Sequence, residues 1–466
     1  SGMQADGQLV NARSLNVQAD GQVQLAGKTL TTDALTLTGQ GVDVSQGQLS
    51  AHHADWRATQ NDVTASGSQV QIATNLHIQT PRSLITDKAH LETAELNLEA
   101  NTWRNIGGTF THTSDKDLHI QLQGNLDNTQ GILQTNSQNL SVQANQLLNQ
   151  EGVILHQGHG QLSVTAQSID NTVKNKTTKA SRITSQGNTA LQIQDTFVNQ
   201  GLVYGFGNLQ IDTGSLSNQG SLVARGDQTI HTQSLSASQD SLIAAGMTGD
   251  GQLAALSNGS TRLSIQAAQA LQNAGQMQAY GTIDIAGSSL DLQQALVANK
   301  TGDLSLTARQ GTILTSQANI QSAGQLDIRA NTNQAQALVN EKGFLAGKEG
   351  VTIETGSVNN TQGVIGSSGG SVILDASGPV NNTRGLIQAQ QNLTHQTHGA
   401  ALINNDTQDV DKRYGIQALG NADIQTGDLT NQAGYIVANG LNLNANRVDN
   451  TQGVIGSSGG SVILDA

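Results

Sequence analysis

Short runs of alternating apolar and polar residues recur along the whole chain. Most are triplets in which two aliphatic side chains flank one polar residue. They begin at Leu15, Leu35, Leu76, Leu96, Leu118, Leu140, Leu162, Leu191, Leu209, Leu263, Ile283, Leu304, Leu326, Val351, Val372, Leu393, Leu441 and Val462, with weaker copies near Trp56, Ile230 and Ala422. Alternation with a period of two is typical of a strand that buries one face. The triplets therefore predict many short strands, one about every 22 residues.

A second pattern, Asn-x-x-Gly, precedes many of these triplets. It occurs at 128–131, 149–152, 360–363, 382–385, 431–434 and 450–453, and each Gly is followed by a second short apolar pair such as Val364-Ile365. Asn and Gly both tolerate a positive φ, and an Asn side chain can bond its own backbone. We expect these residues to form sharp corners between strands.

Units of this size cannot bury an apolar face alone, but stacked copies bury a continuous one. No segment shows a sustained helical period. The sequence therefore predicts an all-β chain folded as a right-handed parallel β-helix (β-solenoid), with about 20–22 residues per coil. Residues 358–376 recur at 448–466 with one difference, Asn359 against Asp449. This duplication indicates a modular array.

Three irregular intervals interrupt the array, and we expect loops that bulge outward near 170–185, 235–260 and 400–415. They contain Lys174 to Arg182, Asp240 to Met247 and Asn404 to Arg413. Insertions in a regular stack fall on its outside, where loops most easily provide binding residues. The basic segment from Lys174 to Arg182 is interpreted as a solvated loop, with binding to an acidic partner as the alternative.

Composition excludes several classes of protein. Aromatic residues make up 2% of the chain and charged residues 12%, Cys is absent, and the net charge is −13. There is neither a disulfide framework nor a thiolate metal site, and binding to nucleic acid or an anionic membrane is disfavoured. No apolar run is long enough to span a bilayer. The chain shows no signal peptide and stops inside a repeat, so we expect it to be a fragment.

Two glycine-containing motifs resemble a phosphate-binding loop and a nucleophile elbow, but both are better explained as turns and strands. Gly27-Lys28-Thr29 lacks the upstream Gly and the following helix of a phosphate loop. Gly366 to Gly370, repeated at Gly456 to Gly460, fits a nucleophile-elbow pattern but lies between strand-like runs.

Three pairs of His residues are candidate zinc ligands: His52 with His53, His156 with His159, and His395 with His398. A spacing of three on an extended strand places the two side chains on opposite faces. We therefore predict no catalytic, cofactor-binding or metal-binding residues and no cofactor.

Longer stretches resemble a known group of proteins. LDNTQGILQTNSQNLSVQA, from Leu126 to Ala144, is similar to the haemagglutinin repeats of filamentous haemagglutinins. The stretch from Ser234 to Leu292 resembles the first repeat region of contact-dependent growth-inhibition effectors. The resemblance covers residues 110–466 well, as haemagglutinin-type coils, and residues 1–109 more loosely, as coils continuous with them.

The resemblance implies a rod exported by two-partner secretion and displayed on a Gram-negative surface. On this interpretation the chain is a monomeric structural shaft, without enzymatic activity, of an adhesin or a toxin-delivery protein. Its partners are an outer-membrane transporter during export and a receptor on a target bacterium or host cell, which is expected to be bound mainly by other regions. The alternatives are a β-helix that binds carbohydrate or a host receptor, and a polysaccharide-degrading β-helix enzyme. The scarcity of sugar-stacking aromatic residues disfavours the enzyme.

Overall fold

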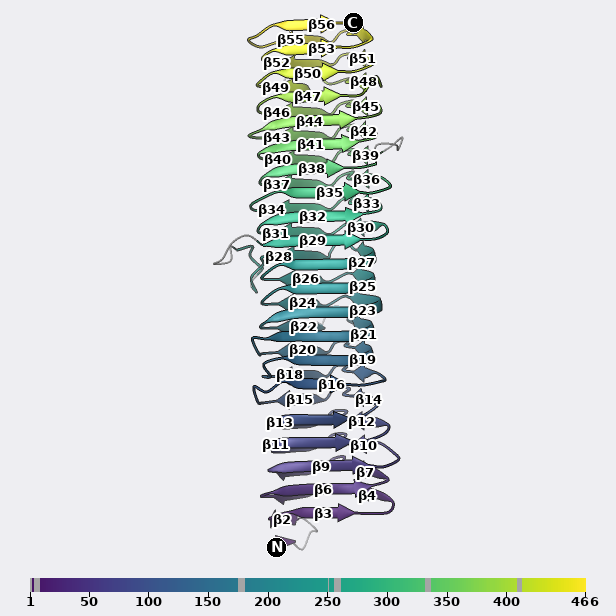
Figure 1. Ribbon diagram of the computed structural model, residues 1–466, viewed down its shortest axis with the longest axis vertical. Coiled ribbons are helices and arrows are strands. Elements are labelled where there is room, and N and C mark those ends of the chain that lie inside the picture. Colours follow the sequence, from purple (N-terminus) through teal and green to yellow (C-terminus); the bar gives the residue numbers. More distant parts are fainter. Residues whose placement is uncertain are drawn as a thin grey trace. The chain divides into compact units, whose positions relative to one another are not determined.

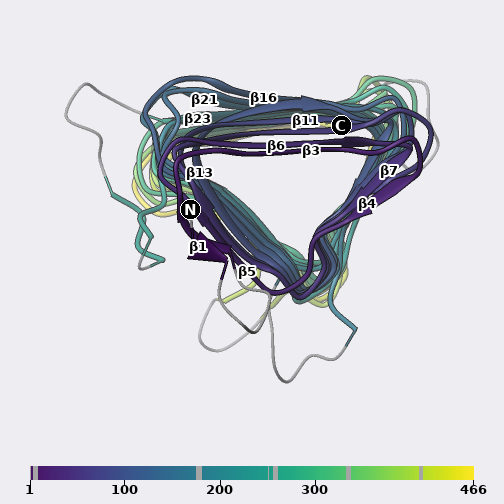
Figure 2. The same cartoon turned by 90° about the horizontal axis from the view of Figure 1, so that it is seen from below.

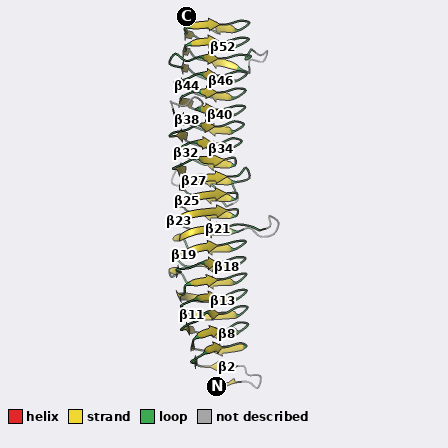
Figure 3. Ribbon diagram, turned by 90° about the vertical axis from the view of Figure 1, so that its right-hand side faces the viewer, coloured by secondary structure: helices red, strands yellow, loops and turns green. Residues whose placement is uncertain are grey.

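The computed structural model of the chain consists of strands and loops (Figure 3). It describes residues 2–3, 9–174, 181–249, 251–254, 261–331, 337–408 and 413–466, and these contain no helix. No segment among them is therefore a helix able to span a membrane. The parallel stacked strands make a β-solenoid of about 20 turns, which confirms the predicted fold class. The chain divides into two compact units, Ser1–Arg225 (unit 1) and Gly226–Ala466 (unit 2).

Each coil of unit 1 has three faces (Figure 2), and each face is a stack of strands from successive coils (Figure 1). Face 1 contains β2 (Leu9–Ala12), β5 (Lys28–Thr31), β8 (Gln48–Ala51), the first halves of β11 (Gln69–Gln79) and β13 (His90–Glu99), β15 (Thr109–His112), β18 (Ile132–Thr135), β20 (Val153–His156), β22 (Arg182–Ser185), β24 (Leu202–Gly205) and β26 (Ser221–Ala224). The short β1 (Gly2–Met3) pairs with β2 in the antiparallel sense.

The other two faces of unit 1 share several long, bent strands. Face 2 contains β3 (Leu15–Gln18), β6 (Ala34–Gly39), β9 (His53–Ala58), the second halves of β11 and β13, β16 (Leu118–Gln121), and the first parts of β19 (Leu140–Leu148), β21 (Gln161–Asn171), β23 (Asn188–Asn199) and β25 (Leu209–Asn218). Face 3 contains β4 (Gln22–Gln24), β7 (Gly41–Asp43), β10 (Val63–Thr64), β12 (Ser83–Ile85), β14 (Thr102–Arg104), β17 (Leu126–Asp127) and the remainders of β19, β21, β23 and β25.

Unit 2 repeats this plan. Face 1 contains β28 (Leu242–Ala245), β31 (Gln276–Ala279), β34 (Leu296–Asn299), β37 (Asn319–Ser322), β40 (Phe344–Gly347), β43 (Val364–Ser367), β46 (Leu386–Ala389), β49 (Gly415–Ala418), β52 (Tyr435–Ala438) and β55 (Val454–Ser457). Face 2 contains the first part of β27 (Gln228–Ala237), then β29 (Arg262–Ala267), β32 (Thr282–Gly287), β35 (Leu304–Ala308), β38 (Gln325–Arg329), β41 (Gly350–Thr355), β44 (Ser371–Ala376), β47 (Leu393–Gln396), β50 (Ala422–Gln425), β53 (Leu441–Asn444) and β56 (Val462–Asp465). Face 3 contains the end of β27, then β30 (Leu271–Asn273), β33 (Leu290–Asp291), β36 (Ile313–Leu314), β39 (Leu338–Val339), β42 (Val358–Asn359), β45 (Val380–Asn381), β48 (Leu402–Ile403), β51 (Asp428–Thr430) and β54 (Arg447–Asp449).

The apolar triplets form straight interior rows, as the alternation predicts. In unit 2 the first triplet residue pairs coil by coil along face 2, from Leu304 through Leu326, Val351 and Val372 to Leu393. These five side chains are at most 1% exposed. Full burial of an aliphatic side chain contributes roughly 1.5–3 kcal/mol, so these rows are the main source of stability in the stack.

One triplet of unit 1 has a register that differs from the prediction. The row that contains Leu162 continues through Thr189 to Leu209, and Leu191 pairs with Val164 and Ile211 instead. Positions two residues apart on a strand point to the same face, so the apolar pattern cannot distinguish these registers. Thr189 is 2% exposed and its hydroxyl has no partner in the described structure.

Face 2 of unit 1 is also interrupted, although the triplets predicted one continuous sheet. β13 pairs with β11 and β16 pairs with β19, but no strand pairing joins β13 to β16 in the described structure. Faces 1 and 3 continue past this point through β15 and β14. The same coil buries Trp103 and Phe110, whose rings pack edge to face at 5.1 Å. These rings belong to β14 and β15, the two strands that lie between β13 and β16 along the chain.

The duplicated segments occupy the same place in the coil. Val358 and Val448 lie in one row of face 3, joined through Val380, Leu402 and Leu429. The offset of the repeat therefore equals four whole coils. Since the repeat contains complete coils, every strand and corner of the copy keeps its register.

Ladders of asparagines, all buried except Asn450, join the corners of successive coils. In unit 1 the side chain of each Asn donates from Nδ2 to Oδ1 of the next, at 2.8–2.9 Å, through Asn105, Asn128, Asn149, Asn171, Asn199 and Asn218. In unit 2 the ladder runs at 2.7–2.8 Å through Asn340, Asn360, Asn382, Asn404, Asn431 and Asn450. The corner Asn therefore bonds its neighbour in the stack as well as its own turn.

The positive φ of these corners does not fall on Asn or Gly, which corrects the prediction. It falls on the residue before the Gly, as in Gln130 (55°) and Gln362 (56°). The Gly is required for space, because a Cβ on Gly131 would lie 2.2 Å from the carbonyl oxygen of Asn105. The close approach of adjacent coils, and not backbone chirality, therefore requires Gly here.

The expected loops lie partly outside the described residues, which omit 175–180, 250, 255–260 and 409–412. Part of the segment near 235–260 is regular strand. β28 pairs in parallel with β31, and Ile243, Ala244 and Ala245 are fully buried. The middle of the Asp240 to Met247 segment, Leu242–Ala245, therefore belongs to the stack and not to a bulge.

Candidate functional site

The two glycine motifs singled out in the sequence are strands and turns. Lys28 begins β5, where the next residue, Thr29, is 2% exposed. Gly366 to Gly370 connects β43 to β44, and Ser367 Oγ accepts a hydrogen bond from the Gly370 amide at 2.9 Å. Neither segment precedes a helix, which a phosphate loop or a nucleophile elbow requires.

The paired histidines do not converge on a common ligand site. His156 is buried and His159 is exposed. His395 is likewise buried, whereas His398 lies outside and its Nε2 is 2.6 Å from Oδ1 of Asp375. Among the residues that the structure describes, no group of three His, Asp or Glu side chains is arranged to hold a metal.

Two buried histidines of face 1 belong to polar rows inside the stack. Nε2 of His156 donates to the Ser137 carbonyl at 2.9 Å, while Nδ1 accepts from Ser185 Oγ, also at 2.9 Å. His112 pairs with Thr135 Oγ1 at 3.1 Å. Burial lowers the pKa of both imidazoles, so the neutral form is favoured and the hydrogen bonds satisfy it.

His395 is different, because it interrupts an aliphatic row of unit 2. It lies between Leu374 and Ile424 in the face 2 register and is 2% exposed. Neither ring nitrogen has a hydrogen-bond partner in the described structure. Burial lowers the pKa of His395 to about 4. An unpaired polar group in an apolar core destabilises the fold, so this residue is a local weak point.

The basic segment from Lys174 to Arg182 provides no site in the described structure. Residues 175–180 lie outside the described part of the chain. Arg182 opens β22, with an exposed side chain on the outer surface of face 1. The acidic-partner hypothesis for this segment stays a prediction.

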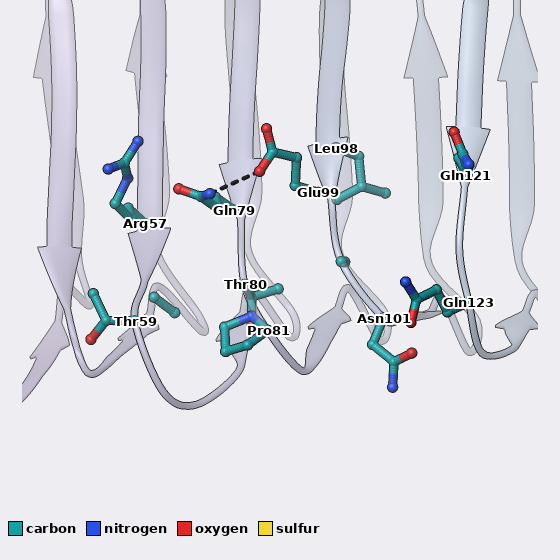
Figure 4. A pocket seen from close by; sticks show the side chains of 12 residues that line it. Arg57, Thr59, Gln79, Thr80, Pro81, Leu98, Glu99, Asn101, Gln121 and Gln123 are labelled. Atoms are coloured by element: carbon teal, nitrogen blue, oxygen red, sulfur yellow. Dashed lines mark hydrogen bonds between the residues drawn. The ribbon is translucent and has the colours of Figure 1, made fainter.

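A hollow in unit 1 follows the corner between faces 2 and 3. It has a volume of about 880 Å³, and its lining includes the ends of β9, β11, β13 and β16 and the turns after them. Figure 4 shows Gln79, Glu99 and Gln121 at these strand ends and Asn101 and Gln123 in the turns. The hollow spans the place where β13 and β16 are unpaired, so the break in the ladder lies in its wall.

A second hollow of about 370 Å³ continues along the same corner and shares Gln121 and Gln123 with the first. Its other polar lining residues are Gln143, Asn145, Thr165, Gln167 and Gln194. We call the two hollows together the amide groove. Its lining is dominated by side-chain amides, each of which both donates and accepts hydrogen bonds.

Charge in the amide groove is confined to one end. Arg57 and Glu99 are the charged residues in the lining of the two hollows, and they carry opposite signs. Nε2 of Gln79, which lies between them in the register, donates to Glu99 Oε2 at 2.8 Å (Figure 4). This arrangement favours hydrogen bonding to a neutral group over binding of a strongly charged one.

Comparison with known proteins identifies the repeats. Five overlapping or adjacent stretches match the Haemagglutinin repeat family, at residues 135–201, 168–275, 248–321, 301–397 and 416–466. Together they cover more than half of the chain. The chain belongs to the haemagglutinin repeat family. As a member of this family it is a filamentous-haemagglutinin or contact-dependent growth-inhibition type of region, as the resemblance predicted.

The haemagglutinin-repeat chain is also similar to Toxin CdiA of Yersinia pestis. The two are 26% identical over 434 residues, which is 79% of this chain and 13% of the relative. The chain thus spans about one eighth of the curated protein that it matches. No solved structure matches the chain.

The haemagglutinin repeats and the similarity to Toxin CdiA show a secreted, cell-surface exoprotein. They also support a structural shaft of a two-partner secretion adhesin or growth-inhibition protein. The repeat region itself is structural, and no catalytic constellation is found in its described residues. Its localisation agrees with the expectation from the sequence.

The amide groove was not predicted from the sequence. The sequence does contain the residues that form it, because Gln121 and Gln143 occupy the same register position in successive coils. Gln123, Asn145 and Gln167 line the same hollow. Amide side chains are common throughout so polar a chain, however. Only the register and the break between β13 and β16 distinguish these from the rest.

Proposed function

We propose that this chain is a shaft segment that holds adhesive or toxin-bearing ends of an exported exoprotein toward other cells. The observation that carries the proposal is the end-to-end linkage of the coils within each unit. Every coil of the 340–450 region is bonded to the next by strand ladders, an aliphatic row and an asparagine pair. Each coil touches only its neighbours and is bonded to them. A stack of this kind therefore holds its two ends at a fixed separation along its axis.

The proposal includes an outer-membrane transporter as the partner during export and a receptor on the target cell. The absence of Cys suits passage of an unfolded chain, since no crosslink can form beforehand. The local linkage of coils also suits export, because a stack can grow one coil at a time as the chain emerges. The receptor is assigned to other regions of the full-length protein.

The test changes the length of the shaft in the full-length exoprotein within its own bacterium. A second copy of residues 377–466 is inserted directly after Ala466, which adds four coils or about 19 Å at ~4.8 Å per coil. The matched control inserts only residues 377–455, which ends inside a coil and shifts every following corner. We expect the first protein to be exported and to act on target cells, and the second to lose surface display.

The readouts are surface labelling of an epitope beyond the shaft and killing or adhesion of target cells. Equal display and activity of both insertions would contradict a register-dependent shaft. Inhibition of target-cell contact by the isolated chain with Gln121→Ala and Gln143→Ala, added in excess, would show that the chain itself binds the receptor and would also contradict the proposal.

A further inference from the structure

Some amides of the groove are bonded to the protein, because Gln79 donates to Glu99, Asn145 to Asn125 and Gln167 to Asp195, whereas four other glutamines of the lining are not. Within the described structure, the side chains of Gln121, Gln123, Gln143 and Gln194 make no hydrogen bond to the protein. Elsewhere the amides are bonded across coils. Gln130 donates to Glu151 and Gln150 to Asp170, both at 2.8 Å. The groove therefore offers free donors and acceptors, and two of these glutamines, Gln121 and Gln143, are direct register partners in successive coils.

The side-chain amides of the groove favour a neutral ligand that is rich in hydroxyl groups. A primary amide offers two N–H donors and a carbonyl acceptor, which match hydroxyl or acetamido groups. A polyanion is disfavoured, because Arg57 is offset by Glu99 and the chain carries a net charge of −13.

The spacing of the amides selects an extended polymer with a matching repeat. Gln121 and Gln143 lie one coil apart, at about 4.8 Å along the stack where the strands are paired. An extended chain of pyranose rings advances by about one ring over this distance. A polypeptide running along the same axis advances about 3.4 Å per residue and falls out of step with this spacing. From β9 to β23 the groove spans about 30 Å at this coil spacing.

We propose that the amide groove binds an extended neutral polysaccharide along the axis of unit 1, with about one sugar ring per coil. The lining of the two hollows contains no aromatic residue, so contact is made by hydrogen bonds and not by stacking on rings. Each ring is held weakly, and affinity accumulates along the chain because successive contacts are linked. The site is independent of what the ends of the exoprotein carry. It also differs from the outward loops, which the sequence suggested as binding segments.

The experiment titrates the 466-residue chain with hexasaccharides, using calorimetry and ligand-observed NMR. The probes are cellohexaose, chitohexaose, the anionic hexamer of galacturonate and an uncharged Ser/Thr decapeptide. The groove variant is Gln121→Ala with Gln143→Ala. The matched control is Gln388→Ala with Gln390→Ala, two exposed glutamines of unit 2. Circular dichroism and thermal melting confirm that both variants fold.

We expect cellohexaose or chitohexaose to bind, the galacturonate hexamer and the decapeptide to bind at least tenfold more weakly, and the control to match the parent chain. Loss of two amide contacts is expected to weaken binding by about tenfold or more. The inference is overturned if neither neutral hexasaccharide binds at millimolar concentration, if the groove variant binds as well as the parent, or if the decapeptide binds more tightly than both sugars.

Discussion

Nδ2 of Asn382 donates a hydrogen bond to Oδ1 of Asn404, one coil further along the stack, at 2.8 Å. The same Nδ2 donates to the carbonyl of Gly385 at 3.2 Å, while Oδ1 of Asn382 accepts from Asn360. One side chain thus closes its own corner and fixes the corners before and after it. All three asparagines are fully buried, so the bonds form in a low dielectric where a missing partner is costly.

Replacement of Asn382 by Ala is expected to destabilise the surrounding coils by about 2–3 kcal/mol, because it leaves the Asn360 amide and the Asn404 carbonyl oxygen partly unsatisfied. Native-state hydrogen exchange at the corners of residues 360–404 measures the loss. Asn444→Ala, at an exposed position, is the matched control and should have little effect. Equal effects of the two substitutions would show that the ladder does not stabilise the stack.

His395 is expected to make unit 2 sensitive to acid. Its pKa is about 4 in the folded chain, against an ordinary value of 6.5, so the unfolded chain binds the proton more tightly. Above about pH 6.5 the imidazole is neutral in both the folded and the unfolded chain, and the free energy of unfolding does not depend on its protonation. As the pH falls from 6.5 toward 4, the unfolded chain takes up the proton first, and the free energy of unfolding decreases. A difference of this size corresponds to roughly 3 kcal/mol. The free energy of unfolding of residues near His395, followed by hydrogen exchange between pH 7 and 4, measures the loss.

The matched variants are His395→Leu and His398→Gln. Leu resembles the neighbours Leu374 and Ile424 in the row, so His395→Leu should stabilise unit 2 and flatten its dependence on pH over this range. His398→Gln, at an exposed position, is the matched control. A steep acid response that persists in His395→Leu would assign the effect to other groups.

Leu306→Asp is expected to open a local stretch of unit 2. Leu306 is fully buried and pairs with Ile285 and Ile328, so an unpaired carboxylate there is strongly unfavourable. Hydrogen exchange should rise over the coils that flank Leu306, while the coils near Leu140 stay protected. Uniform loss of protection along the chain would indicate one cooperative globule and contradict the nearest-neighbour description of the stack.

The repeat chain is expected to show no polysaccharide-degrading activity. Incubation with pectin, alginate and other polyanionic glycans, with and without calcium, should release neither unsaturated nor reducing ends. The enzymatic alternative requires several acidic or basic residues and aromatic side chains in one groove, whereas the amide groove is lined mainly by amides. Turnover that one carboxylate substitution abolishes would overturn the structural interpretation.

The sequence predicted the fold, the coil length and most interior rows. Alternation determines which side chains face inward, and a one-residue slip would move a whole strand's apolar side chains outward. The row from Leu304 to Leu393 therefore follows from the apolar pattern alone. The resemblance to haemagglutinin repeats was likewise confirmed. It could be recognised in the sequence because each repeat is a short continuous segment of the chain.

The candidate site was much less accessible to prediction. The amide groove depends on which glutamines share a register and on the unpaired strands β13 and β16. Neither property follows from a period of two. In the sequence His395 stands out only by its spacing from His398, whereas its importance comes from its place in the row between Leu374 and Ile424.

The sequence by itself determined that this chain buries aliphatic rows in stacked coils with Asn-x-x-Gly corners, because each coil carries the same short-range pattern. Only the tertiary structure decided that Thr189 and not Leu191 continues the row, that Gln130 and not Asn128 takes the positive φ, and that face 2 is interrupted after β13. The reason is physical: alternation fixes the direction of a side chain, whereas contact between coils fixes register, space at the corners and the position of every hollow.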